Sequence, residues 1–321
     1  MREGLRESRT CDMLCIENVQ KGSVNMTDFK KLIASYADCD CGMEHRCDIK
    51  DIRVGSGLVR HVGEILQEND FPKKILLVAD RNTIKAADGI LESLQGFEVE
   101  QYIYDDLRVA TMEDVHLVEG YFDRVDGVLA VGTGSIHDPS RMACANGKKQ
   151  LALFATAPSM DGFASYNAPI VEGNFKTTLS AKCPEVIIAD TKILADAPTE
   201  LKSAGFGDMV SKYVALIDWQ VSHLVTGEHY CEKVAALTRY AADNLMKMAD
   251  KITVNDEEAA GAVFESLLMT GIAMAFTCTS RPGSGTEHIM AHYWECLELL
   301  EGKVPNYHGE DVGVTTLIML R

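Results

Sequence analysis

The pattern of apolar residues changes once along the chain, and this change limits the folds that the chain can adopt. From residue 51 to about residue 197, short apolar runs rich in β-branched residues alternate with amphipathic stretches. The predicted buried strands are 73–80, 97–104, 124–132, 150–158 and 185–190, and helices are predicted at 82–96 and 112–122. Strands that alternate with helices are typical of a mostly parallel sheet with crossover helices.

After Pro198 the pattern is helical nearly throughout. The predicted helices are 208–225, 230–252 and 255–276. The fold class that follows is an α/β N-terminal domain, residues 51–197, followed by an all-α C-terminal domain, residues 198–321. Residues 1–50 are interpreted as an N-terminal extension, in which a helical segment is followed by a cysteine-rich loop.

Composition excludes several classes of function. A chain of 321 residues that is 46% hydrophobic is long enough for two cores. Its net charge of -17 argues against non-specific binding to nucleic acid or to an anionic membrane, both of which need a basic surface. We find no apolar run near the roughly 18–20 residues of a membrane span, and the polar N-terminus lacks a signal-peptide core, so we expect a cytoplasmic protein.

The ten cysteines, with no secretion signal, indicate reduced thiols rather than a disulfide framework. The exception is the cluster of Cys39, Cys41, His45 and Cys47, which is a candidate structural zinc site. Because its spacings match no standard zinc module, ordinary thiols are the alternative interpretation.

Four residues in the C-terminal half are candidate metal ligands: Asp208, His288, His292 and His308. His288 and His292 are four residues apart in a helical pattern, so both imidazoles project from one face. We expect Asp208, which follows two glycines, near the start of a helix, and Gly309 beside His308 to let the backbone approach an ion. A carboxylate with two histidines suits a divalent transition metal and leaves a coordination position open, with His292 as the spare imidazole. The alternative is that these histidines are ordinary surface or core residues.

A glycine-rich loop follows the predicted strand that ends at Gly132. Its sequence is Gly132-Thr133-Gly134-Ser135, and Asp138-Pro139 has the character of a helix N-cap and first turn. Amides in such a loop, together with the positive end of the helix dipole, favour a pyrophosphate. The third glycine of the dinucleotide fingerprint is absent, so a simple strand-to-helix turn is the alternative.

A second loop, with the sequence ATAPSMDGFAS, also follows a predicted strand. It offers the hydroxyls of Thr156, Ser159 and Ser165 at the carboxyl end of the sheet, where open α/β folds bind ligands. Asp161 in this loop is either a functional charge or half of an ordinary Asp-Gly turn. Asp80 ends another predicted strand, where a carboxylate accepts hydrogen bonds from a ribose and favours NAD over NADP, unless it is only a turn residue.

Five motifs give the chain a family resemblance: GTGSIHD, TAPSMDGFAS, AGFGDMVSKY, the EHIMAH pair and YHGE. In this order and approximate separation they resemble the sn-glycerol-1-phosphate dehydrogenases, within the superfamily of dehydroquinate synthase, glycerol dehydrogenase and the iron-containing alcohol dehydrogenases. The resemblance covers residue 49 to the end, and the CDCG segment is similar to the N-terminal region of bacterial members.

The resemblance implies a cleft between a dinucleotide-binding domain and a metal-binding domain. It assigns one divalent ion, zinc or nickel, to Asp208, His288 and His308, and assigns Asp161 and His292 to the substrate. It assigns NAD(H) to Gly132, Thr133, Gly134, Ser135, Asp138, Thr156, Ser159 and Ser165. Asp80 joins these candidate coenzyme residues because of its place at the end of a predicted strand. The implied reaction interconverts dihydroxyacetone phosphate and sn-glycerol 1-phosphate. Candidate partners for the substrate phosphate are Lys212, best placed one helical turn beyond Asp208, and then Arg281 and Lys176, unless all three are solvated bases.

Other functions remain open from the sequence. A dehydroquinate synthase typically has Glu as its first metal ligand, where this chain has Asp208. A glycerol dehydrogenase acting on an unphosphorylated polyol also uses Asp with two His, and a non-catalytic dinucleotide-binding subunit could keep the fold. The chain ends within the apolar segment GVTTLIMLR, whereas members of the resembled family continue with further helices. We therefore expect a shortened helical domain and a homo-oligomer, with a dimer favoured.

Overall fold

The computed structural model describes residues 27–173 and 175–321. Six parallel strands form its main sheet, in the spatial order β1–β8–β5–β4–β2–β3. The strands are β1 (Asp51–Gly55), β2 (Lys74–Asp80), β3 (Glu98–Tyr104), β4 (Gly127–Gly132), β5 (Gln150–Ala155) and β8 (Val186–Asp190). The five strands predicted from the sequence all lie in this sheet; β1 adds an edge that we did not predict.

Alternating side chains of the central strands cover the two faces of the sheet. Ile75 and Leu77 of β2 pack on one face, against α3 (Val62–Glu68) and α5 (Ile90–Ser93). Leu76 and Val78 pack on the opposite face, against α6 (Met112–Glu119) and α7 (Gly134–Gly147). Because both faces are covered, the strands read as nearly continuous apolar runs in the sequence.

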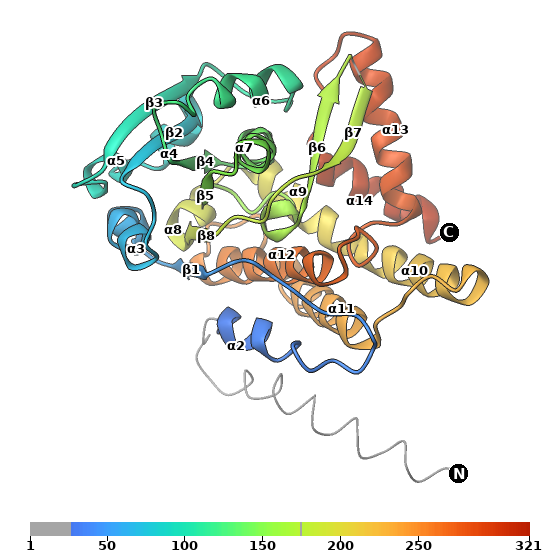
Figure 1. Cartoon of the computed structure of the whole chain (residues 1–321). Coiled ribbons are helices and arrows are strands. Elements are labelled where there is room, and N and C mark those ends of the chain that lie inside the picture. The colour runs from blue at the N-terminus through green and yellow to red at the C-terminus, as the bar shows by residue number, and fades with distance from the viewer. Residues whose placement is uncertain (1–26, 174) are drawn as a thin grey trace.

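One local prediction in this half was wrong, and one element was not predicted. The helix predicted at 82–96 is split into α4 (Arg81–Ala86) and α5, because Gly89 between them has φ of 93°. We also did not predict the antiparallel hairpin of β6 (Asn167–Glu172) and β7 (Phe175–Ser180). This hairpin leaves the main sheet and stands beside α13 (Thr286–Leu300), so a segment from the α/β half reaches the helical half (Figure 1).

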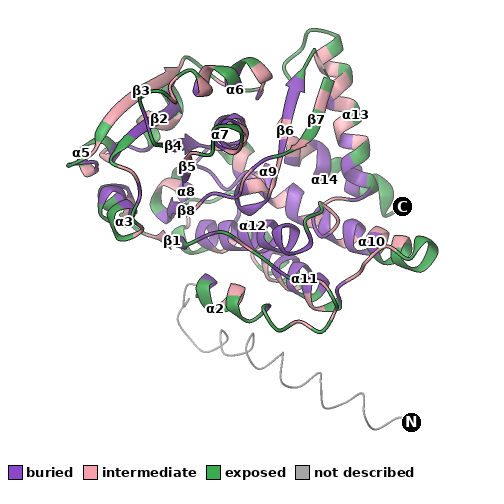
Figure 2. Cartoon of the chain, viewed as in Figure 1, coloured by how far each residue is buried: buried purple, intermediate pink, exposed green. Residues whose placement is uncertain are grey.

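The rest of the chain is helical, as the sequence predicted. After α8 (Thr191–Asp196) come α9 (Thr199–Val210), α10 (Lys212–Thr226), α11 (Glu232–Met246), α12 (Glu257–Thr277), α13 and α14 (His308–Met319), with a short 3-10 helix at Ala249–Lys251. Two more 3-10 helices, Leu58–His61 and Gly162–Ala164, lie in the α/β half. Helix α12 lies at the centre and is buried along most of its length (Figure 2). By length and composition alone this helix could span a membrane, contrary to the expectation from the sequence. However, 94% of its apolar window is buried inside the fold, as in the core helix of a soluble protein.

The glycines before Asp208 do not form the expected turn. Gly205 and Gly207 lie inside α9, and Asp208 stands near the end of that helix rather than at the start of the next. A Cβ on Gly207 would overlap the carbonyl oxygen of Gly309 in α14, and a Cβ on Gly309 would overlap that of Ala204 in α9. These glycines therefore let α9 and α14 cross with their backbones in contact, and Gly309 serves this crossing.

The described part of the predicted extension packs on the helical half; residues 1–26 lie outside the described residues. Helix α2 (Phe29–Ala34) buries Phe29 in the helical core, and the Thr27 hydroxyl donates to Glu265 of α12 at 2.7 Å. In the loop that follows, Cys39, Cys41 and His45 gather, but their fourth neighbour is Cys231. Cys47, which we had grouped with them, lies against Cys183 instead.

We predict that Gly207→Ala destabilises the protein by on the order of 1–3 kcal/mol, because the new methyl group would overlap the α14 backbone. Denaturant unfolding followed by circular dichroism measures this change. Gly55→Ala is the matched control, since its Cβ would meet only Leu58 side-chain atoms at 3.6 Å or more. Equal stability of the two variants would contradict the tight crossing.

Candidate metal centre and coenzyme cleft

Asp208, His288 and His308 come from three different helices and meet in the structure. Asp208 is near the end of α9, His288 lies in the first turn of α13, and His308 is the first residue of α14. One ligand atom from each lies within 4.8 Å of the others. Asp208 is completely buried and His288 is buried, whereas His308 is partly exposed. The sequence-predicted ligand set is therefore assembled, with access from the side of His308.

The geometry of this group fits a small divalent ion. Nε2 of His288 lies 3.5 Å from Oδ1 of Asp208. Two ligands about 2.1 Å from a tetrahedrally coordinated ion are about 3.4 Å apart. Nδ1 of His288 lies 2.7 Å from Glu287, and Nδ1 of His308 lies 2.8 Å from Glu295. A carboxylate that accepts from Nδ1 leaves Nε2 with its lone pair free for the ion, as is common for metal-binding histidines.

A buried lysine balances the charge of the carboxylates. The Lys212 ammonium, completely buried, lies 2.6 Å from Oδ1 of Asp208 and 2.8 Å from Oδ2 of Asp161, and donates to the Gly283 carbonyl at 2.9 Å. Burial alone would raise the pKa of Asp208, but the charge of Lys212, 2.6 Å away, holds it well below its usual value. Burial and the neighbouring charge of Asp208 raise the pKa of Asp161. Asp208 is therefore ionised, as a metal ligand must be.

His292 belongs to a second, overlapping group with Glu295 and His308. The His292 ring stacks on that of His308 with centroids 4.9 Å apart, and its Nδ1 lies 2.8 Å from Oε2 of Glu295. Burial lowers the pKa of His292 to about 4, so the ring is neutral at pH 7. Both oxygens of Glu295 are thus engaged by imidazole Nδ1 atoms, which makes Glu295 an orienting group for the rings.

A cavity of about 580 Å³ adjoins the candidate metal centre. It is lined on one side by residues of the α/β half, including the N-terminal end of α7, and on the other by residues that include Glu295, Tyr307 and His308. Asp161 and Lys176 also line it, whereas Asp208, His288 and His292 do not. His308 therefore joins the metal centre to the cavity.

Most of the predicted coenzyme residues line this cavity. They are Asp80, Thr133, Gly134, Ser135, Asp138, Thr156 and Ser159. Gly132 does not line it, because Ile136 packs over its α-carbon. Ser165 does not line it either, since its buried hydroxyl accepts from Arg141 at 3.1 Å and donates to the Asn167 carbonyl.

Helix α7 begins earlier than we predicted. Its N-cap is Thr133 and its first residue is Gly134, so Asp138 and Pro139 lie inside the helix. Asp138 forms a buried ion pair with Arg141 at 3.0 Å instead of capping the helix. The backbone amides of Gly134 and Ser135 are therefore the first two of the helix, and both residues line the cavity. An anion site at a helix N-terminus requires this placement.

Asp80 has two roles. Its Oδ1 accepts hydrogen bonds at 2.8 Å from the amides of Asn82 and Thr83, which makes it the N-cap of α4. The structural interpretation of Asp80 as a turn residue is therefore correct for its contacts with α4. Asp80 also lines the cavity at the carboxyl end of β2, the place where the ribose interpretation needs it.

Of the three candidate phosphate partners, only Lys176 lines the cavity. Lys212, which the sequence ranked first, is buried between two carboxylates and is neither solvated nor exposed in the cavity. Arg281 pairs with Glu228 at a distance of 2.9 Å, and neither residue lines the cavity. Lys176 of β7 lies 2.8 Å from Glu295, so the unpredicted hairpin supplies a cation beside the metal centre.

Sequence reasoning missed the two glutamates that orient the imidazoles. Glu295 accepts from His292, His308 and Lys176, and the neighbouring His308 and Lys176 hold its pKa far below the usual value although burial opposes this. A signal was present, because Glu295 is seven residues after His288 and three after His292, on the same helical face. Glu287 is completely buried beside His288. Its position next to His288 in the sequence does not predict a contact between the two side chains, because adjacent helical residues do not face each other.

Comparison with known proteins agrees with this geometry. Residues 53–198 match the family described as iron-containing alcohol dehydrogenase. The chain is 36% identical over 298 residues to the glycerol-1-phosphate dehydrogenase [NAD(P)+] of Halalkalibacterium halodurans, covering 90% of this chain and 74% of that protein. It is also 36% identical over 274 residues to the enzyme of the same name from Methanothermobacter thermautotrophicus, covering 84% and 77%.

Solved structures share the fold at lower sequence identity. A probable glycerol dehydrogenase from Sinorhizobium meliloti superposes with a TM-score of 0.71 and 19% identity, covering 85% of this chain and 76% of that one. Glycerol dehydrogenase from Schizosaccharomyces pombe superposes with a TM-score of 0.69 and 19% identity, covering 87% and 73%. These structures therefore share the arrangement of an α/β sheet followed by a helical half.

The sequence identity to these enzymes exceeds 30% over most of both chains, which is enough to define the family of this chain. The chain belongs to the glycerol-1-phosphate dehydrogenase family.

We predict that Glu295→Gln weakens metal binding by about ten- to a hundredfold, because an amide oxygen holds the His308 ring less firmly than a carboxylate does. Competition against a chromogenic chelator measures the affinity. Glu301→Gln is the matched control, since Glu301 lies just past the same helix and pairs with exposed Lys303. Unchanged affinity in Glu295→Gln would show that this carboxylate does not orient a ligand.

Proposed function

We propose that this chain is a metal-dependent NAD(P)(H) oxidoreductase that interconverts dihydroxyacetone phosphate and glycerol 1-phosphate. The relatives named glycerol-1-phosphate dehydrogenase support the reaction class. One structural observation carries the proposal: the Asp208–His288–His308 group reaches, through His308, the same cavity that is lined by the N-terminus of α7. An ion bound at the first place and a dinucleotide bound at the second would both lie next to the part of the cavity that is left for the substrate.

The residues divide the chemistry between them. Asp208, His288 and His308 would hold the ion and the α7 N-terminus the coenzyme, so that the ion supplies positive charge at the substrate oxygen and the nicotinamide supplies or accepts the hydride. The finer assignments are zinc or nickel as the ion and NAD as the preferred coenzyme, since the Asp80 carboxylate would repel a 2′-phosphate.

We assign proton transfer to His292 and a hydrogen bond with a substrate hydroxyl group to Asp161. If Nδ1 of His292 donates to Glu295, its Nε2 is a proton acceptor, which is the form needed to take a proton, through a water or a hydroxyl, when the alcohol is oxidised. Asp161 lines the cavity, and Lys212 fixes its carboxylate in place. It is therefore positioned to accept a hydrogen bond from a substrate hydroxyl group.

Other predictions remain untested. The homodimer is supported only by exposed apolar side chains on α10 and α14, such as Leu224, Val225 and Leu317. The cytoplasmic location also stays a prediction, as does the sn-1 configuration of the product, which rests on the family alone.

The direct test is NADH oxidation with dihydroxyacetone phosphate by chelator-treated protein, before and after zinc or nickel is added back. We expect turnover only with metal, and a loss of at least a hundredfold in His288→Ala because one of three ligands is removed. His116→Ala is the control, since His116 is exposed on α6 and pairs with Glu119. Protein that binds NADH but stays inactive with every metal would contradict the proposal and favour a non-catalytic subunit.

A second variant tests the phosphorylated substrate. We predict that Lys176→Met raises KM for dihydroxyacetone phosphate by on the order of ten- to a hundredfold, through loss of a charged contact to phosphate, and changes kcat/KM for dihydroxyacetone little. Lys182→Met is the matched control, because Lys182 is similarly buried and pairs with Glu185 outside the cavity. An equal loss on both substrates would mean that Lys176 only positions Glu295. Wild-type preference for dihydroxyacetone would favour a glycerol dehydrogenase.

A further inference from the structure

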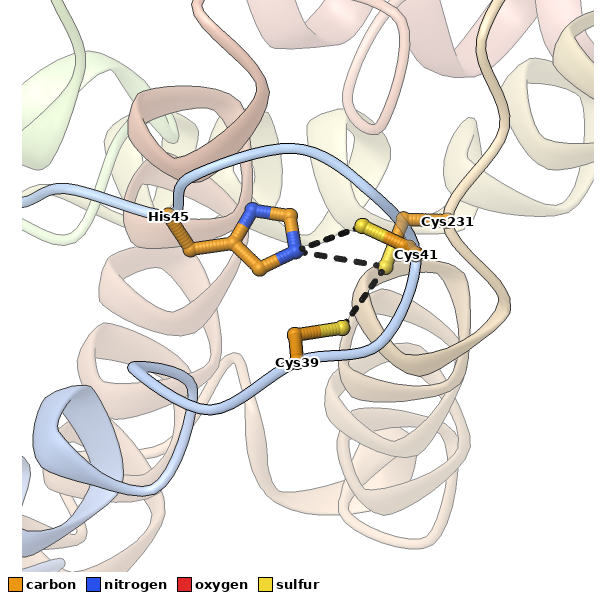
Figure 3. A group of neighbouring side chains, drawn as sticks. All are labelled: Cys39, Cys41, His45 and Cys231. Atoms are coloured by element: carbon orange, nitrogen blue, oxygen red, sulfur yellow. Dashed lines mark hydrogen bonds between the residues drawn. The ribbon is translucent and has the colours of Figure 1, made fainter.

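Four side chains with metal-binding chemistry meet at a place that does not line the cavity. Cys39, Cys41 and His45 lie in the loop that follows α2, and Cys231 is the N-cap residue of α11 (Figure 3). One atom from each, three Sγ and one imidazole nitrogen, lies within 4.8 Å of all the others. His45 and Cys231 are buried, and Cys39 and Cys41 are partly buried.

Three distances within this cluster are close to those of a tetrahedral zinc site. Sγ of Cys39 lies 3.7 Å from Sγ of Cys231, too far for a disulfide. Nε2 of His45 lies 3.2 Å from Sγ of Cys41 and 3.4 Å from Sγ of Cys231. Ligands at about 2.3 Å for sulfur and about 2.05 Å for nitrogen around one zinc ion are about 3.8 Å apart for two sulfurs and about 3.6 Å for sulfur and nitrogen.

The His45 ring is oriented for metal binding. Its Nδ1 lies 2.9 Å from the carbonyl oxygen of Phe276, at the end of α12. A carbonyl oxygen only accepts, so Nδ1 carries the proton and Nε2 directs its lone pair at the cysteine sulfurs. This is the tautomer that a metal-binding histidine requires.

Without a cation the cluster has no strong interaction of its own. Thiols are weak hydrogen-bond donors, so the contacts of the three sulfurs with one another and with the His45 ring contribute little stabilisation. The Cys231 sulfur also faces the amide of Val234 at the N-terminus of α11, where negative charge is favoured. Binding of Zn²⁺ would release three thiol protons and leave a site of net charge -1, partly balanced by this helix terminus.

We propose that Cys39, Cys41, His45 and Cys231 bind one zinc ion as a structural site, which fastens the segment after α2 to the helical half of the chain. Four protein ligands leave no open position, so the site is structural and not catalytic. Cys39 and Cys231 are separated by 192 residues. Contacts on both sides of α2 also attach this part of the chain, since Thr27 donates to Glu265 and Tyr36 stacks on Phe276 at 4.6 Å. The ion would complete this attachment.

The test uses full-length His288→Ala protein, in which a ligand of the other candidate metal centre is removed. We expect about one zinc per chain by elemental analysis, and an X-ray absorption spectrum that fits three sulfurs at about 2.3 Å and one nitrogen at about 2.0–2.1 Å. Adding Cys39→Ser or Cys231→Ser should remove at least nine-tenths of the zinc. Adding Cys47→Ser should leave it, because Cys47 lies in the same loop but packs against Cys183.

Each other result would overturn the proposal. These results are absence of zinc from the His288→Ala protein, a spectrum dominated by nitrogen and oxygen ligands, zinc retained by both serine variants, or a Cys39–Cys231 disulfide detected by mass spectrometry. If the serine variants do not fold, the absorption spectrum of the His288→Ala protein decides alone. None of these readouts requires turnover, so they are independent of the proposed reaction.

Discussion

The crossing of α9 and α14 is the contact on which the candidate active site depends. Gly207 and Gly309 bring the two backbones together, and this places Asp208 beside His308 although 100 residues separate them. The same helix, α14, holds the start of α13, because the Thr315 hydroxyl donates to the carbonyl of Glu287, the residue before His288. Helices that pack through ordinary side chains lie about 8–10 Å apart. Asp208 and His308 can therefore come within reach of one ion only because glycines replace larger side chains at the crossing.

The charges buried around this crossing are arranged as matched sets. Lys212 lies between Asp161 and Asp208, and Glu295 receives two imidazoles and Lys176. A buried charge that loses its partner costs several kcal/mol, so each member constrains the position of the others. The arrangement fixes the direction in which each His ring presents its second nitrogen, and it explains why Lys212 is unavailable to a substrate.

Much of the fold could be predicted from local patterns, and much of the site could not. The strands at 73–80 and 150–158 were recognisable because buried parallel strands are continuously apolar. The roles of Gly205 and Gly207 were misread, because sequence does not distinguish a glycine that turns the chain from one that admits a neighbouring backbone. The spacing of Glu295 from His288 was a usable signal, because it places both side chains on one helix face. Cys231 could not have been found, since only the folded chain brings it to Cys39.

Anomalous diffraction from crystals of metal-loaded protein, recorded at the absorption edge of the metal, tests the central claim most directly. Two overlapping groups share His308, and only one of them uses Asp208. The account predicts an anomalous peak within bonding distance of Asp208, His288 and His308, with Glu295 remaining on the Nδ1 atoms of its two imidazoles. A peak bound by His292, Glu295 and His308 would contradict it, because Glu295 would then be a ligand and Asp208 only the partner of Lys212.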